Sequence, residues 1–183
     1  MEYKVLKVLL RTTIHSRLFL LMTFSLFLFG CNHGLAPITV QPGFGGTVRF
    51  VSAWPPADSV LNLRVVAFRD YPPQNIITEV TSGSALVYPP IAASSLPTFV
   101  DSVTYSFTLD SASTFKYLAV VMQYGSNILQ DWEVVGAYGY SHGAGTPKQV
   151  IVSQNNFLNG IDFDVDFKNL PPNPLGASVS DRR

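Results

Sequence analysis

Three aspartates in residues 161–167 alternate with apolar residues, and carboxylates in such a pattern are candidate ligands for calcium. Along an extended strand, Asp162 and Asp166 lie about 13 Å apart at roughly 3.3 Å per residue. A calcium ion needs oxygen ligands at about 2.4 Å, so the three aspartates cannot share one ion. We therefore interpret Asp162, Asp164 and Asp166 as the solvated face of a strand and predict no metal site. Two of them could still converge with a loop carboxylate such as Asp131.

The glycine-rich stretch of residues 136–147 is the second candidate for chemistry. It lacks a Lys-Ser or Lys-Thr pair at the spacing of a phosphate-binding loop, so a nucleotide site is not predicted. Apart from His142, the only histidine after residue 30 is His33, which leaves a multi-histidine zinc site without ligands. Ser141 stands beside His142 without the glycine pattern of a nucleophile elbow. We predict no catalytic residue and no cofactor.

Aromatic side chains accompany the same glycines. Loops at the ends of β domains often carry function, and rings with polar tips suit the recognition of a sugar or a protein. The residues that we predict to contact a ligand are Trp132, Tyr138, Tyr140 and His142. A glycine-rich hairpin loop without function, with tryptophans that only cap the core, is the alternative interpretation of these residues.

Two other functions stay open on the sequence alone. A hydrolase or metal-dependent enzyme would build its site from Asp131, His142 and one of the C-terminal aspartates, with the side chains within about 4 Å of one another in a concave pocket. A carbohydrate-binding domain would present a flat row of exposed Trp and Tyr side chains. Neither pattern is specific here, so we do not predict an enzyme.

Alternation of apolar and polar residues with a period of two dominates the chain after Gly46, and such alternation predicts half-buried antiparallel strands. Residues 103–109 and 115–124 flank a four-residue turn and predict a hairpin. Phe107 and Phe163 are predicted to lie in the core. The predicted strands number about nine and cover residues 48–50, 61–68, 75–80, 85–88, 103–109, 115–124, 132–138, 149–153 and 161–167.

Strands at this spacing, without helices between them, predict an all-β sandwich or barrel. The segment Gly46-Thr47-Val48-Arg49-Phe50, the Val-rich strand after it and the Tyr-x-Phe hairpin resemble the transthyretin-like and carboxypeptidase-regulatory-like modules of exported bacterial proteins. The resemblance spans about residues 45–124 and implies an antiparallel β-sandwich of the Ig-like or transthyretin-like type. Some related bacterial surface sandwiches cross-link a first-strand lysine to a last-strand asparagine. Arg49 stands at the lysine position, so no such bond is expected, despite Asn169.

The N-terminus has the parts of a secretory signal. Basic residues precede an apolar stretch at residues 18–29, and this stretch of about twelve residues is short of the roughly twenty that a membrane span requires. Leu28, Gly30 and Cys31 match the Leu-x-Gly-Cys lipobox, and the segment resembles bacterial lipoprotein signals, although Phe29 is bulkier than usual before the glycine. The resemblance implies that Cys31 becomes the lipidated N-terminus, with palmitate among its acyl chains. Asn32, in place of an aspartate, favours the outer membrane.

These observations predict a lipid-anchored binding or structural module of the cell envelope. Residues 1–30 are the predicted signal peptide, residues 31–44 a tether, residues 45–170 the β domain and residues 171–183 a disordered tail. The first 30 residues hold four of the 12 basic residues and one of the 12 acidic ones, so the rest has a net charge of about −3. A basic footprint for nucleic acid is therefore lacking. The expected partners are the membrane, through the lipid, and an envelope protein or glycan.

Overall fold

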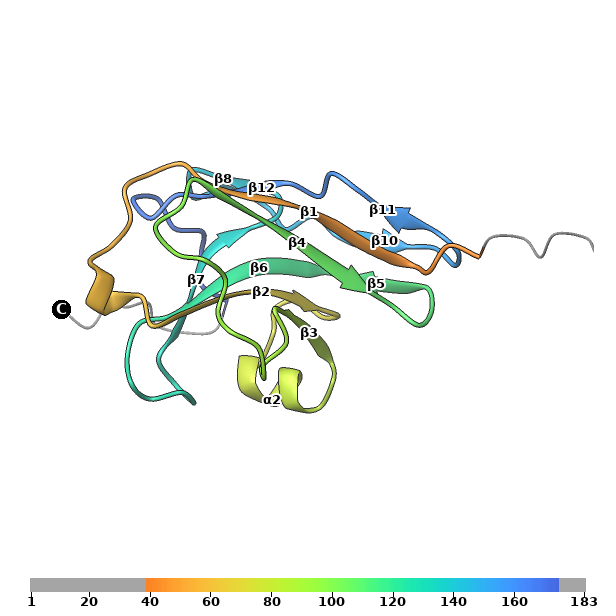
Figure 1. The fold of residues 1–183 in the computed structure, drawn as a ribbon, viewed down its shortest axis with the longest axis horizontal. Helices are drawn as coiled ribbons and strands as arrows, with labels where there is room; N and C mark the ends of the chain where they lie inside the picture. Colours follow the sequence, from red (N-terminus) through yellow and green to blue (C-terminus); the bar gives the residue numbers. More distant parts are fainter. Residues whose placement is uncertain (1–38, 175–183) are drawn as a thin grey trace, which may run out of the picture. The chain divides into compact units, whose positions relative to one another are not determined.

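Strands make up most of the regular structure in residues 39–174, the part of the chain that the computed structural model describes (Figure 1). Within these residues there is a single α-helix, α2 (Ile76–Thr81), and one 3-10 turn, η1 (Ala57–Ser59). The prediction of an all-β fold is confirmed. The predicted signal peptide, Cys31 and residues 175–183 lie outside the described residues. No helix in residues 39–174 has the length and hydropathy of a membrane span.

The first sheet is built around β1 (Gly43–Phe50), the earliest strand of the domain. One edge of β1 pairs antiparallel with β4 (Ser102–Thr108). The other edge pairs in parallel with two short strands near the C-terminus, β11 (Phe157–Leu158) and then β12 (Phe163–Val165). The first and last strands of the described chain are therefore direct neighbours.

The second sheet is antiparallel throughout and has the order β3–β2–β6–β7. A β-bulge interrupts the pairing of β6 with β7 between Val120 and Val121. Two smaller ladders join β5 to β10 and β8 to β9. The strands not yet delimited are β2 (Asn62–Phe68), β3 (Ala85–Tyr88), β5 (Ser113–Phe115), β6 (Tyr117–Gln123), β7 (Trp132–Ala137), β8 (Tyr140–Ser141), β9 (Ala144–Gly145) and β10 (Val150–Val152).

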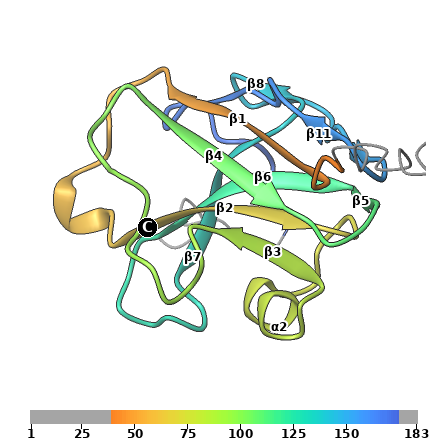
Figure 2. The same ribbon diagram turned by 45° about the vertical axis from the view of Figure 1, so that its right-hand side comes forward.

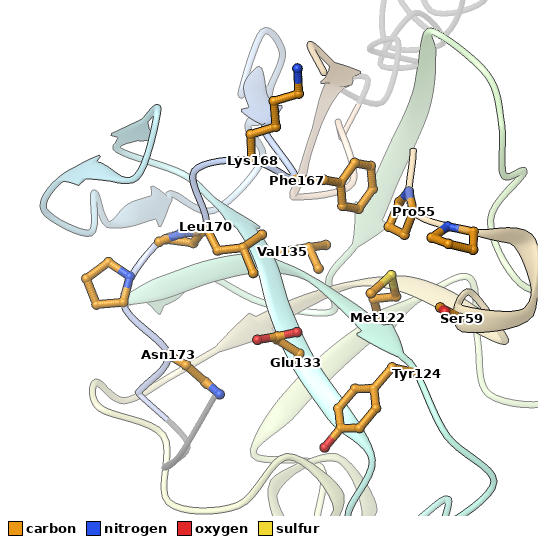
Figure 3. Close-up of a pocket in the computed structure, with 13 residues that line it drawn as sticks. Pro55, Ser59, Met122, Tyr124, Glu133, Val135, Phe167, Lys168, Leu170 and Asn173 are labelled. Carbon is orange, nitrogen blue, oxygen red and sulfur yellow. The ribbon is translucent and has the colours of Figure 1, made fainter. Parts of the chain in front are cut away.

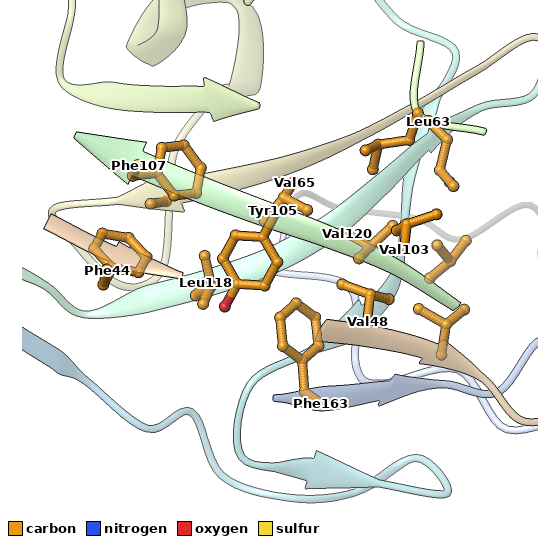
Figure 4. Packing of buried hydrophobic residues seen from close by; sticks show 14 of the residues in the cluster. Phe44, Val48, Leu63, Val65, Val103, Tyr105, Phe107, Leu118, Val120 and Phe163 are labelled. Carbon is orange, nitrogen blue, oxygen red and sulfur yellow. The ribbon is translucent and has the colours of Figure 1, made fainter. Parts of the chain in front are cut away.

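The two large sheets share one apolar core, to which Val48 of the first sheet and Val65 and Val120 of the second contribute fully buried side chains (Figure 4). Phe107 and Phe163 are 5% and 4% exposed, which confirms their predicted place in the core. Strand β4 alternates exposed and buried residues along its whole length, as its sequence pattern predicts. Burial of one face of each sheet is what stabilises such a pair of layers.

A second, smaller cluster covers the outer face of the second sheet, and here the structure corrects a prediction. Residues 75–80, expected as a strand, instead hold the helix cap Asn75 and most of α2 (Figure 2). Ile76 of α2 packs into this cluster. The Asn75 side chain caps the helix by accepting a hydrogen bond from the Thr78 backbone N–H, at 2.9 Å. A side chain that satisfies a free N–H of the first turn favours a helix start, and this local signal outweighs the apolar pattern.

The predicted hairpin of residues 103–124 is also wrong. Strand β4 pairs with β1, whereas β6 pairs with β2 and β7, so the chain crosses from one sheet to the other between them. Strand β5 lies within this crossing and pairs with β10. The alternation pattern identifies which face of each strand is buried, but it does not identify the partner strand.

Candidate functional site

A groove of about 880 Å³ opens at one end of the domain and is the strongest candidate for a binding site (Figure 3). Its volume lies in the range of pockets that bind drug-sized ligands. Four separate segments of the chain supply its walls. We call it the end groove and define it by its lining residues: Pro55, Pro56, Ser59, Met122, Tyr124, Glu133, Val135, Phe167, Lys168, Leu170, Pro171, Pro172 and Asn173.

One wall of the end groove is formed where β6 ends and β7 begins. Met122 and Glu133 are direct cross-strand partners there, so their side chains share one face of the sheet. That face continues into the core through Val135, which is fully buried. Glu133 is only 6% exposed. The end groove therefore holds a carboxylate among apolar side chains.

The opposite wall is the segment that follows β12, and Asp166 holds it in place. The Asp166 carboxylate accepts hydrogen bonds from the Asn169 side-chain amide at 2.9 Å and from the Lys168 backbone N–H at 3.0 Å. The hydroxyl of Ser52 accepts a hydrogen bond from the Phe167 backbone N–H at 2.8 Å. These bonds fix the turn at residues 166–169, from which Phe167 and Leu170 reach the groove.

Residues assigned to the predicted tail complete this wall. Pro171 is buried, and Pro171, Pro172 and Asn173 all line the end groove. At the other boundary, Gly43 and Phe44, assigned to the predicted tether, belong to β1, and Phe44 is fully buried.

The end groove lies far from the point where the described chain begins. Strand β1 starts at Gly43 and runs for eight residues, roughly 23 Å at 3.3 Å per residue, before it reaches the connection that carries Pro55 and Pro56. Figure 1 shows η1 and the first residues of β1 at opposite ends of the domain.

None of the four ligand-contact residues predicted from the sequence lines the end groove. Trp132 directly precedes Glu133 on β7, and successive residues of a strand point to opposite faces. The Trp132 side chain accordingly packs against the outer cluster, and its indole N–H donates to the Ile128 carbonyl at 2.8 Å. Trp132 therefore has its packing and hydrogen-bond partners outside the end groove.

The two tyrosines that were predicted to contact a ligand pack against different clusters. Tyr138 packs against the main core, where its ring lies 6.4 Å from that of Phe163. Tyr140 packs against the outer cluster, and burial, followed by a hydrogen bond with Tyr71, raises the pKa of Tyr140 to about 12. A flat row of exposed aromatic rings, the pattern expected of a carbohydrate-binding face, is not formed by these residues.

His142 occupies the turn between β8 and β9, where its φ is +48° and that of Gly143 is +74°. Its ring Nδ1 lies 2.9 Å from the Asp166 carboxylate, and its side chain is otherwise exposed. Hydrogen bonds from Asn169, then from His142 and from the Lys168 backbone, lower the pKa of Asp166. The pair connects the β8–β9 turn to the wall of the end groove.

The side chains of the possible enzyme site, Asp131, His142 and a C-terminal aspartate, do not all come together. Asp131 accepts a hydrogen bond from the Asn127 backbone N–H at 2.9 Å, in the loop that enters β7, whereas His142 follows the far end of β7 and pairs with Asp166. Among residues 39–174, no group of three His, Cys, Asp or Glu side chains is arranged to hold a metal ion. His142 and a C-terminal aspartate do meet, but without Asp131.

Asp162 and Asp164 face solvent as predicted, and both contact Arg49. The Arg49 Nε lies 2.8 Å from Asp164, its partner across the parallel β1–β12 pair, and a second guanidinium nitrogen lies 3.9 Å from Asp162. Arg49 thus forms an exposed ion pair with Asp164. Asp166 departs from the prediction, because β12 ends at Val165 and the following carboxylate turns inward to 8% exposure.

The residues of the end groove were not predicted from the sequence, because they come from four segments that no local pattern connects. The only signal in the chain was Glu133, a carboxylate inside a run of strand-forming residues, where buried charge is uncommon. Comparison of the chain with protein-family models, curated proteins and solved structures finds no match.

Proposed function

We propose that this chain is a lipid-anchored binding module of the bacterial cell envelope, with the end groove as its binding site and no catalytic activity. The lipobox at Leu28, Gly30 and Cys31 supports the anchor, and the short apolar stretch before it supports export through a cleaved signal. The same signal, with Asn32 after the cysteine, favours the outer membrane. An envelope protein is the partner that fits this location.

The observation that carries the proposal is the end groove itself, a concave site of about 880 Å³ to which four segments of the chain contribute. A concave, mainly apolar site with a few polar groups is the usual form of a binding pocket. The end groove has this form, because four prolines, Met122, Val135 and Leu170 supply apolar lining and Ser59 and Lys168 are among its few polar residues.

We further assign the domain to the transthyretin-like sandwiches, a finer class than the all-β fold. The shared core between the two large sheets and the resemblance of residues 45–124 support this assignment. In such an arrangement the loops at one end of the layers come together, which suits a site made from four segments.

The anchor is tested with Cys31→Ser in cells supplied with a labelled fatty acid. We expect the wild-type chain to carry the label and to run at the size of the processed protein. The variant should accumulate as an uncleaved, unlabelled precursor. Normal processing and labelling of the variant would contradict the lipid anchor.

The groove is tested by site-specific photocross-linking in cells. A photoreactive phenylalanine analogue at Tyr124 lines the groove, whereas the same analogue at Thr104 lies on the exposed face of β4. We expect a discrete adduct from position 124 and none from position 104. Adducts from position 104 alone would move the binding surface to the outer face of the first sheet.

A further inference from the structure

We propose that Asn159 is a self-modification site, at which the side-chain amide is converted to aspartate and isoaspartate without an enzyme. The reacting groups are the Asn159 amide, the backbone nitrogen of Gly160 and water. Asn159-Gly160 is the only Asn-Gly pair in the sequence, and both residues are exposed. This inference does not depend on the lipid anchor or on the end groove.

The pair lies in the connection between β11 and β12, two short strands that follow each other along β1 (Figure 1). Phe44 pairs with Leu158 and Val48 with Phe163, so four residue steps along β1 face five along the C-terminal segment. One residue of this segment is therefore left over as a β-bulge, and such an extra residue stays unpaired. The φ of +74° at Gly160 suits this place, because glycine adopts the left-handed region without strain.

The bulge leaves the Gly160 N–H out of the ladder. The Gly45 carbonyl accepts a hydrogen bond at 3.1 Å from the N–H of Ile161, one residue beyond Gly160. Within residues 39–174, neither the Gly160 N–H nor the Asn159 side chain has a hydrogen-bond partner. The peptide nitrogen that must attack is thus free to lose its proton and to turn toward the asparagine side chain.

Open space surrounds the reacting atoms. A Cβ at Gly160 would meet no atom within 4 Å beyond its chain neighbours, and glycine itself has no side chain to obstruct the approach. The exposed asparagines elsewhere are less well placed. Asn155 is followed by Asn156, whose side chain crowds the nitrogen, and the Asn127 side chain accepts a hydrogen bond from the Leu129 N–H at 3.0 Å.

The reaction needs no oxidant or reductant. The Gly160 nitrogen attacks Cγ of Asn159, the new C–N bond closes a five-membered imide, and the Cγ–Nδ2 bond breaks. Ammonia leaves and carries away the proton of the Gly160 N–H. Water then opens the imide at one of its two carbonyl carbons, which yields either aspartate or the β-linked isoaspartate.

Either product changes this edge of the first sheet. Both place a new carboxylate near Asp162, whose carboxylate accepts a hydrogen bond from the Thr47 N–H at 2.8 Å. Isoaspartate also inserts one more atom into the main chain between Leu158 and Phe163, which both pair with β1. The modification therefore acts on the register of β12.

The test incubates the purified full chain, in detergent micelles, in mildly alkaline buffer made with heavy-oxygen water. Peptide mapping by mass spectrometry locates each incorporated oxygen, and electron-transfer fragmentation separates isoaspartate from aspartate. We expect incorporation at Asn159 before Asn127 and Asn155. Because the Gly160 N–H is outside the ladder, we expect the rate at Asn159 to lie within about tenfold of the rate in an unstructured peptide of residues 155–163.

Two glycine variants complete the design. Gly160→Asn keeps a residue that tolerates the left-handed region and makes the site an Asn-Asn pair, so modification of Asn159 should slow by about tenfold or more. Gly83→Asn is the matched control, because Gly83 has a φ of +76° and equally open surroundings in the turn after α2. It should leave the rate at Asn159 unchanged. Urea denaturation confirms that both variants are folded.

Three results would overturn the inference. A rate at Asn159 more than about tenfold below that of the peptide would show that the fold protects this amide. Equal rates at Asn155 and Asn159 would show that the bulge does not select the site. An unchanged rate in Gly160→Asn would exclude attack by an unobstructed glycine nitrogen. All three are measured on the purified chain, so none of them bears on the proposed binding function.

Discussion

His142 Nδ1 and the Asp166 carboxylate lie 2.9 Å apart, although 24 residues separate them in the chain. Asp166 interacts with three residues, Lys168, Asn169 and His142, whereas His142 makes one of these contacts and is largely exposed. The carboxylate is therefore the organising group of the pair. Because Phe167, Lys168 and residues 170–173 line the end groove, the shape of that wall depends on Asp166.

Replacing Asp166 with Asn should lower the melting temperature and broaden the methyl resonance of Leu170. The amide keeps the size of the side chain but loses the charge and one acceptor site. Asp164→Asn is the matched control, because Asp164 makes only an exposed ion pair with Arg49, and such pairs contribute about 0–1 kcal/mol. Equal melting of the two variants would show that the Asp166 network does not stabilise the fold.

The same carboxylate predicts a pH dependence. Hydrogen bonds lower the pKa of folded Asp166 below its ordinary value of 3.8, so the folded state binds this proton less readily than the unfolded state. Its contribution to stability is complete above about pH 5 and is lost as the pH falls through 3.8 toward the folded-state pKa. The gap in melting temperature between wild type and Asp166→Asn should shrink from pH 6 to pH 2. A constant gap would contradict the assignment.

Truncating either of two core aromatics should be costly. Phe107→Ala and Phe163→Ala each should lower the free energy of unfolding by about 3–5 kcal/mol, because they leave a cavity between the two sheets. Phe99→Ala is the control, since Phe99 is 50% exposed at the surface. Urea denaturation measures all three. Unchanged unfolding of the core variants would contradict the register of β4 and β12.

Removing one hydroxyl should stabilise the domain. Within the described residues, the buried Tyr117 hydroxyl has no hydrogen-bond partner, and burial raises the pKa of this tyrosine. An unsatisfied buried polar group costs free energy, so Tyr117→Phe should raise the free energy of unfolding by about 1 kcal/mol. The fully buried ring would keep its contacts with Phe68 and Tyr71. A destabilised variant would reveal a partner for the hydroxyl, such as a bound water.

A methyl group at Gly136 should separate the two sheets. A Cβ there would lie 2.6 Å from Cγ2 of Val165 and 2.9 Å from the Asp164 carbonyl oxygen, so β7 and β12 would have to move apart. Gly136→Ala should cost about 1–3 kcal/mol. Ala137, next along β7, packs against the outer cluster, and Ala137→Gly is a control that deletes a methyl on the other face. Melting of Gly136→Ala at the wild-type temperature would contradict this close approach.

Local patterns in the sequence predicted burial better than they predicted pairing. Alternation placed Phe107 and Phe163 in the core, because a strand with one buried face needs that period whatever its neighbours are. It missed α2, where the Asn75 cap decides the conformation. Alternation also extended the aspartate face to Asp166, although β12 ends one residue earlier. The end groove could not be predicted from the sequence, because it forms only when four distant segments meet in the fold.

The pairing of β1 with β12 sets a condition on the order of folding. Arg49 and Asp164 are 115 residues apart, so the first strand of the domain cannot complete its sheet until almost the whole chain is available. Contacts of such long range form slowly, because the intervening loop must close first. A chain that is still being synthesised thus keeps β1 without its parallel neighbours β11 and β12. The first sheet is therefore completed only when β12 has been made, whereas all four strands of the second sheet lie before residue 138.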